Sequence, residues 1–161
     1  MIHVTGKAER ISEAKRIQDQ LERAFAGRAW HGPAVLELLA GVEAGKAAAR
    51  PIAGAHSIWE LVLHIAAWDR AVARRLAGNR AELPDEEDWP AVNDTSDEAW
   101  QQALETLKRC HRQLHEAIGR VEDAKLDEPI VAGMASTYGT LHGAIQHDLY
   151  HAGQIAMLKK A

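Results

Sequence analysis

The sequence predicts an all-α protein, a four-helix bundle with a short extra helix after the first long one. Apolar residues recur at helical spacing in four long segments, and no segment shows the sustained alternation of a strand. Two of these segments open with Ser or Thr followed three residues later by Glu, which is the pattern of a capping box. Loops of roughly a dozen residues separate most of the helices, as in helical bundles.

The first long helix is expected over about residues 7–27, where Gly27 ends it. A short helix should follow over residues 33–41, with Pro33 as its first residue, because proline suits the first helical position. Residues 45–55 contain proline and glycine and are expected to form a loop.

The second long helix should begin at Ser57, because Glu60 follows at the spacing of a capping box. It is expected to end near Gly78. An acidic linker over residues 79–94, interrupted by two prolines, should lead to the third long helix.

A second capping box, Thr95 with Glu98, predicts the start of the third long helix. Its apolar residues continue at close to heptad spacing as far as Val121. Residues 122–137 are expected to form a loop, and residues 138–159 the last helix.

The composition excludes several classes of protein. With 161 residues, 47% of them hydrophobic, the chain is long enough for one domain over residues 1–161 with a sizeable core. Its net charge of −4 gives no electrostatic case for binding nucleic acid, and no stretch approaches the roughly 18 apolar residues of a membrane span. Residues 1–7 lack the apolar segment of a secretory signal, and the single cysteine, Cys110, can form no intrachain disulfide. A cytoplasmic location is the default expectation.

Histidine is the unusual feature of this composition. Nine histidines outnumber Phe, Trp and Tyr combined, and imidazole is the commonest metal ligand. His147 and His151 are four residues apart in the last expected helix and therefore share one face of it. Because two imidazoles hold a metal only weakly, a third ligand is expected, and His64 of the second long helix is the candidate. Three imidazoles would leave a coordination position for water or substrate.

Other interpretations of the histidines stay open from spacing alone. A pair of histidines four residues apart is often surface decoration, and a single His such as His64 is often a hydrogen-bonded core residue. His111 and His115 form a rival pair beside Cys110. Because Cys110 is rotated away from His115 on a helix, we expect Cys110 to pack as a small hydrophobe and His115 to lie near the surface. His111 is expected either in the core or as a partner of a metal ligand.

Four residues near the three histidines are candidates for supporting roles. Glu60 faces nearly the same way as His64 and could act as a general base, but we favour its capping role. Gln154 lies on the histidine stripe and is the better candidate for orienting a ligand imidazole, since Asp148 points away from that stripe. Trp68 is close enough to His64 to form a wall of a pocket.

Two stretches carry a resemblance to a known family, GAHSIWELVLHIAAW over residues 54–68 and QHDLYHAGQI over residues 146–155. With the Gly32-Pro33 helix start and the spacing of the four helices, the chain resembles the DinB-like superfamily, which includes YfiT-like thiol transferases, over essentially its whole length. The resemblance implies an up-down-down-up bundle, a metal site of His64, His147 and His151, zinc or nickel as the ion, and a dimer.

The resemblance leaves the activity open among thiol S-transferases, isomerases and hydrolases. We expect an enzyme in which the metal activates a low-molecular-weight thiol, or water, against a small-molecule substrate. The alternative is a stress-response module whose metal is structural. A fourth protein ligand, such as Glu60 or His111, would favour the alternative.

The last helix also predicts how the chain assembles. If the histidine stripe faces the interior, a second apolar stripe lies about half a turn away. We expect this stripe to form a homodimer interface or to lie beneath residues 79–94. Its members are Leu141, Ile145, Leu149 and Ala156.

Overall fold

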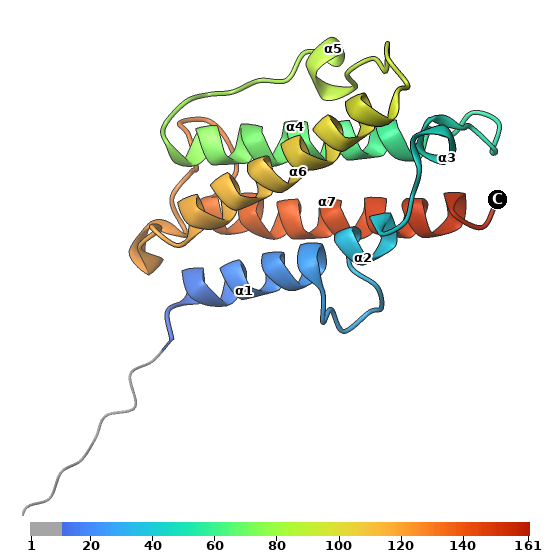
Figure 1. The fold of residues 1–161 in the computed structure, drawn as a ribbon. Helices are drawn as coiled ribbons and strands as arrows, with labels where there is room; N and C mark the ends of the chain where they lie inside the picture. Colours follow the sequence, from blue (N-terminus) through green and yellow to red (C-terminus); the bar gives the residue numbers. More distant parts are fainter. Residues whose placement is uncertain (1–10) are drawn as a thin grey trace, which may run out of the picture.

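The computed structural model describes residues 11–161, and this part of the chain is helical and contains no strand (Figure 1). The predicted all-helical class is therefore confirmed. The four long helices are α1 (Glu13–Ala26), α4 (Ile58–Leu76), α6 (Asp97–Ile118) and α7 (Thr137–Leu158). The short ones are α2 (Val35–Leu39), α3 (Ala44–Ala48), α5 (Asp85–Asp88) and the 3-10 turn η1 (Asp123–Lys125).

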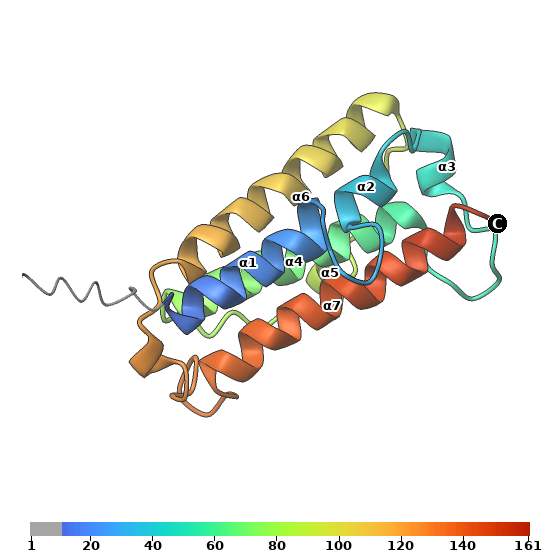
Figure 2. The same ribbon diagram turned by 90° about the horizontal axis from the view of Figure 1, so that it is seen from below.

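The four long helices pack side by side as a bundle. Both α1 and α4 contact α6 and α7, so α1 and α4 lie across the bundle from each other. Figures 1 and 2 show α1 and α7 running in one direction and α4 and α6 in the other. The long link between α4 and α6 carries α5 over the outside of α4. This arrangement brings the middle of α7 beside the middle of α4.

Several predicted boundaries hold and others need correction. Gly27 ends α1 with a φ of 145°, a conformation that favours glycine. In the described part α1 starts after its N-cap Ser12, and residues 7–10 of the expected helix lie outside the described residues. The short helix α2 begins at Val35, after Pro33 instead of at it. The expected loop over residues 45–55 contains most of α3, which is too short to show a helical period.

The helix caps give one confirmation and one correction. Ser57 caps α4 and forms the predicted capping box, in which the Ser57 Oγ accepts from the Glu60 N–H and the Glu60 carboxylate accepts from the Ser57 N–H. The Thr95 prediction is wrong. Ser96 is the N-cap of α6, and its Oγ accepts a hydrogen bond from the Ala99 N–H at 3.2 Å. Thr and Ser side chains can both cap a helix, so the sequence pattern does not distinguish a start at Thr95 from a start at Ser96.

The core consists of two apolar clusters stacked along the bundle. One lies among α2, α3 and the adjoining parts of α4, α6 and α7, and the other around α1, η1 and the opposite ends of the same long helices. Leu141 and Ile145 belong to the second cluster, and Leu149 packs against it. The second stripe of α7 thus faces this protein's own core. The reason given for a dimer through that stripe, and for a cover by residues 79–94, is therefore wrong.

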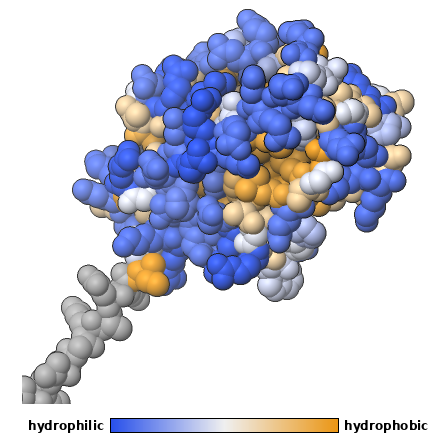
Figure 3. All heavy atoms as spheres, viewed as in Figure 1, coloured by the Kyte–Doolittle hydropathy of each residue, from blue (hydrophilic) through white to orange (hydrophobic). Residues whose placement is uncertain are grey.

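Figure 3 shows one face of the molecule, on which hydrophilic side chains cover most of the surface and hydrophobic ones gather near its centre. A groove between α2 and α6 is lined by apolar side chains that include Leu36, Leu39 and Leu104. Within residues 11–161, no helix is both long enough and apolar enough to cross a membrane.

Candidate metal centre

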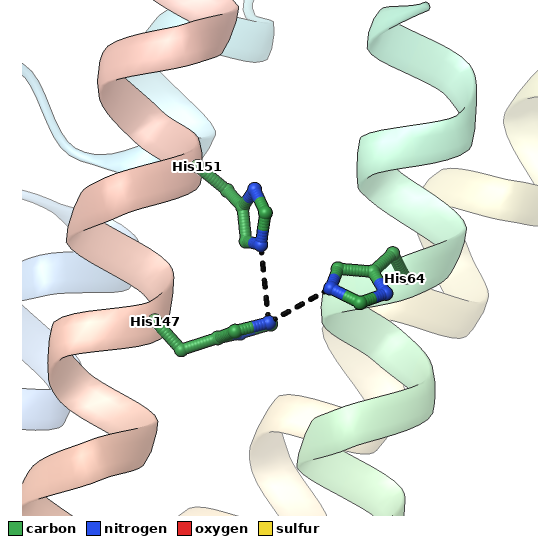
Figure 4. A group of neighbouring side chains, drawn as sticks. All are labelled: His64, His147 and His151. Carbon is green, nitrogen blue, oxygen red and sulfur yellow. Dashed lines mark hydrogen bonds between the residues drawn. The ribbon is translucent and has the colours of Figure 1, made fainter. Parts of the chain in front are cut away.

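Three histidine side chains from two helices meet beside the core. His64 comes from α4, and His147 and His151 come from successive turns of α7. Their Nε2 atoms converge, with 2.9 Å between those of His147 and His64 and 3.1 Å between those of His151 and His147 (Figure 4). The three predicted ligands therefore lie together as a group that could hold a metal ion.

The position of each histidine follows from its helix. On α7 the spacing of four residues stacks His147 and His151 on one face. His64 lies on the face of α4 that packs against α7, with 5% of its surface exposed. His151 is equally buried, whereas His147 is half-buried. Of the three histidines, His147 is therefore the most accessible from outside the bundle.

Hydrogen bonds to the other ring nitrogens fix how two of the imidazoles are protonated. The Nδ1 of His64 lies 2.8 Å from the Asp88 carbonyl oxygen, and the Nδ1 of His151 lies 2.6 Å from Oε1 of Gln154. Because these oxygens accept, each Nδ1 carries the hydrogen and each Nε2 presents a lone pair. Gln154 thus has the orienting role predicted for it.

The resulting arrangement has more acceptors than donors. The lone pairs of His64 and His151 both face Nε2 of His147, which has at most one hydrogen to give. At least one pair of nitrogens therefore meets lone pair to lone pair, which a cation between them would relieve. The donor set fits a divalent transition metal, since neutral imidazole suits zinc and nickel.

The surroundings of His147 and His151 favour the neutral form of these two imidazoles. Burial, together with the neighbouring His151 and His64, lowers the pKa of His147 to about 3. Burial lowers the pKa of His151 as well, although its hydrogen bond to Gln154 opposes the shift. Neutral imidazoles are the form that binds metals, so the protein holds these side chains ready at neutral pH.

Two tryptophans lie beside the histidines, Trp89 from the α4–α6 link and Trp68 from α4. The Trp89 ring stacks on His64 with centroids 3.7 Å apart, and on its other face it stacks on His56 at 3.6 Å. The Trp68 Nε1–H donates to an Asp88 carboxylate oxygen at 2.7 Å, which ties α4 to α5. Trp68 was predicted as a wall, and its ring centroid lies 5.9 Å from that of His147. Asp88 and Trp89 were not predicted, because an irregular segment has no helical or strand periodicity that would place its side chains. The one signal available was a lone tryptophan in an acidic linker.

Glu60 is not part of the histidine group. Its carboxylate accepts from the Ser57 N–H at 2.7 Å and pairs with Arg50. Although burial opposes it, the hydrogen bonds from Ser57 and the charge of Arg50 lower the Glu60 pKa. The preference for a structural role is thus confirmed.

The rival pair separates as predicted. Cys110 is buried in the first apolar cluster, and His115 is half-buried beside Gln18. His111 is buried and its ring stacks on Phe25 with centroids 3.7 Å apart. It does not reach the three histidines and joins a second group instead.

That second group consists of Asp69, His111 and Asp148. Burial raises the pKa of Asp148 to about 8, and burial together with Asp148 raises that of Asp69 well above its usual range. Burial lowers the pKa of His111 to about 4. Asp148 points away from the histidine stripe as predicted, whereas Asp69 was not singled out, because an isolated Asp in an apolar helix face carries no spacing signal.

Comparison with known protein families decides the relationship. The sequence model of the DinB superfamily matches residues 29–155, which are most of the chain. The chain belongs to the DinB superfamily. This range contains all three histidines of the candidate centre, and the predicted resemblance to DinB-like proteins is confirmed. No curated protein and no solved structure matched the sequence significantly.

Proposed function

We propose that this DinB-superfamily protein binds one divalent transition metal, zinc or nickel, with His64, His147 and His151. We further propose that it is an enzyme that activates a low-molecular-weight thiol or a water molecule against a small-molecule substrate. The observation that carries the proposal is the convergence of three Nε2 atoms in a group that, among the described residues, includes no fourth ligand. Three protein ligands and one exchangeable position are typical of catalytic sites, whereas structural sites are closed by four.

The side chains around the centre have separate tasks in this proposal. Asp88 and Gln154 hold the rings of His64 and His151 by their Nδ1 atoms, so that each Nε2 stays aimed at the ion. Trp89 lies over the ring of His64 and limits access of water from that side. A bound metal would lower the pKa of a thiol or water that reaches the exchangeable position.

Two cavities beside the histidines could receive the substrate. One of about 430 Å³ is lined largely by apolar side chains and includes Tyr150, Met157 and Gln154. Another of about 260 Å³ is lined by His147, Trp68 and Arg75 among others. Both are of a size for a small molecule. The second is lined by His147 itself and the first by Gln154, which holds the His151 ring, and this supports a small-molecule partner.

The alternative of a purely structural metal requires a closed site. Its two candidate fourth ligands have other partners: the Glu60 carboxylate binds Ser57 and Arg50, and the Nε2 of His111 lies 3.1 Å from the Glu22 carboxylate. These contacts favour the enzymatic interpretation over the structural one.

Metal content of protein purified without an affinity tag tests the ligand set. His64→Ala, His147→Ala and His151→Ala should each lose most of the ion bound at this centre, because two imidazoles cannot hold it as three do. His115→Ala is the matched control and should keep the native content. Full occupancy of the centre in His64→Ala would contradict the proposed third ligand.

Activity is tested by loading the protein with zinc or nickel. Low-molecular-weight thiols are then offered with an electrophilic aryl halide, and activated esters are offered for hydrolysis. Native protein and His115→Ala should accelerate one of these reactions, and His64→Ala should not. Equal rates for native protein and His64→Ala with every substrate, alongside a metal that binds and stabilises the native protein, would favour the structural alternative.

A homodimer remains part of the proposal, through a surface other than the buried stripe of α7. Light scattering at high protein concentration measures it. A native protein that stays monomeric at every concentration would contradict it.

A further inference from the structure

A layer of three polar residues, the acidic layer, crosses the middle of the bundle between its two apolar clusters. Asp69 lies on α4, His111 on α6 and Asp148 on α7, and their exposed fractions are 2%, 3% and 0%. On each helix the polar residue falls between members of one cluster and members of the other. One ligand atom from each residue lies within 4.8 Å of the other two.

Most of the polar atoms in this layer have no partner. Oδ2 of Asp69, Nδ1 of His111 and both carboxylate oxygens of Asp148 are buried without a hydrogen bond to any of residues 11–161. On the other side of the His111 ring, Nε2 lies 3.1 Å from the Glu22 carboxylate. A buried polar atom without a partner destabilises the folded state, because it has lost its hydrogen bonds to water. Four such atoms from three helices around one point indicate a missing ligand.

The chemistry of the layer selects the kind of ligand. A divalent cation binds carboxylate oxygens and imidazole nitrogen alike, and it would neutralise both carboxyls in the ionised form that binding requires. A single water molecule can donate only two hydrogen bonds, whereas the layer has four unpartnered atoms on three residues. The 3.8 Å between Nδ1 of His111 and Oδ2 of Asp69 fits two ligands on one ion with metal–ligand distances of about 2.1 Å.

We propose that Asp69, His111 and Asp148 bind a second divalent cation, separate from the one held by the three histidines. Its two oxygen ligands and one nitrogen ligand suit Mn²⁺ or Fe²⁺, whereas the three imidazoles suit zinc or nickel. His111 binds the ion through Nδ1, while Glu22 orients the ring through Nε2, in the manner of carboxylates that support metal-bound histidines.

The structure also provides a route to this site. The cavity of about 260 Å³ between α4 and α7 is lined by Asp69 of the acidic layer and by His147 of the histidine centre. An ion that enters this cavity meets a carboxylate at its inner wall. The two sites thus adjoin one cavity but differ in ligand charge, which would let each select its own metal.

Metal counting tests the second site on the whole chain. Chelator-treated protein is incubated with Zn²⁺ and Mn²⁺ together, freed of unbound ions by gel filtration and analysed for both elements. Native protein should retain one ion at each site, with Mn²⁺ at the acidic layer. Asp69→Asn should lower Mn²⁺ affinity at least about tenfold while retaining Zn²⁺. The exposed Asp127→Asn is the matched control and should retain both ions.

A second arm separates this inference from the proposed function. The double variant His64→Ala, His151→Ala should lose Zn²⁺ but retain Mn²⁺, and Mn²⁺ should raise its thermal midpoint. Adding Asp69→Asn to that double variant should abolish the rise. If Asp69→Asn fails to fold, His111→Asn on another helix provides the same comparison. Mn²⁺ binding that is unchanged by Asp69→Asn, or absent from the double variant, would overturn the second site and leave the histidine centre unaffected.

Discussion

Gln154 shows how a single residue outside the ligand set controls the candidate centre. Its amide oxygen lies 2.6 Å from Nδ1 of His151 and so determines which ring nitrogen of that residue keeps a lone pair. Without this contact the His151 ring could turn or present an N–H toward His147. The role of Gln154 was predictable, because it lies three residues after His151 on the same helix face.

Replacing Gln154 should therefore weaken metal binding without removing a ligand. We expect Gln154→Leu to lower metal affinity by about 10–100-fold, the usual effect of losing a group that orients a ligand. Gln154→Glu should preserve affinity, because a carboxylate also accepts the Nδ1 hydrogen. Competition with a chromophoric chelator measures both, with the exposed Gln101→Leu as control. Native affinity in Gln154→Leu would contradict the orienting role.

The contacts that Asp88 and Trp89 make with His64 could not be predicted from the sequence. Trp89 and Asp88 contact His64 from a link whose path depends on the packing of α5 against α4. The meeting of Asp69 with His111 could not be predicted for another reason, although His111 was expected in the core or beside a ligand. Their spacing matches the apolar face of each helix, so that only the folded structure shows that they meet.

Helix ends are where the elements of this protein were predicted best and also where an error occurred. Ser57 with Glu60 forms the expected reciprocal cap of α4. At α6 the sequence offers Thr95 and Ser96 in succession, and the Glu98 that pointed to Thr95 does not decide between them. Helices of four or five residues, such as α3 and α5, were missed because they are too short for a period to appear.

Removing the caps should affect stability in a way that follows the structure. We expect Ser57→Ala and Ser96→Ala each to cost about 1 kcal/mol in the free energy of unfolding, since each hydroxyl accepts from a free N–H of the first turn. Thr95→Ala should cost close to nothing. Urea denaturation of the three variants measures this. An equal loss for Thr95→Ala and Ser96→Ala would show that the cap assignment is wrong.

The first turn of α1 is capped from a distant segment. The Asp123 carboxylate accepts from the N–H groups of Glu13 and Ala14 at 2.8 and 3.0 Å, so η1 holds the start of α1. These hydrogen bonds lower the pKa of Asp123. A carboxyl group whose pKa is lowered by folding stabilises the folded state above its ordinary pKa, and loses that effect as the pH falls through the folded value.

Asp123→Asn should therefore be less stable than the native protein at pH 7, and the difference should shrink as the pH falls below about 3.8. Denaturation midpoints of both proteins at several pH values test this. Asp127→Asn, which changes a nearby exposed carboxylate, is the control. A difference that stays constant down to pH 3 would mean that the Asp123 charge contributes nothing to the cap.

At the scale of the whole molecule, the histidine centre joins α4 to α7. Its residues His64 and His147 are 83 positions apart in the sequence. A metal that binds the folded chain and not the unfolded one must stabilise the fold. We expect about 4 kcal/mol at a free metal concentration roughly a thousandfold above Kd. Thermal unfolding with and without chelator measures it, and His64→Ala should lose most of this stabilisation. Identical midpoints for native protein with and without metal would contradict binding at the centre.

The packing of α7 was the part of the bundle that the sequence predicted least well. A helix at the surface of a bundle needs one apolar face to pack on the core. A second buried-looking face on α7 therefore favoured an interface with another chain. In the structure α7 packs its second stripe against the core, and its histidine face lies against α4 and Trp89. What the sequence pattern did not show is that both stripes of α7 are covered within one chain.

Anomalous X-ray diffraction from crystals of tag-free protein loaded with zinc, recorded on both sides of the zinc absorption edge, tests the central claim most directly. The account predicts an anomalous peak about 2.0–2.1 Å from Nε2 of each of His64, His147 and His151, the ordinary zinc–imidazole distance, with a non-protein ligand completing the coordination. A peak elsewhere in the molecule with none between these three nitrogens, or a peak closed by a fourth protein side chain, would contradict it.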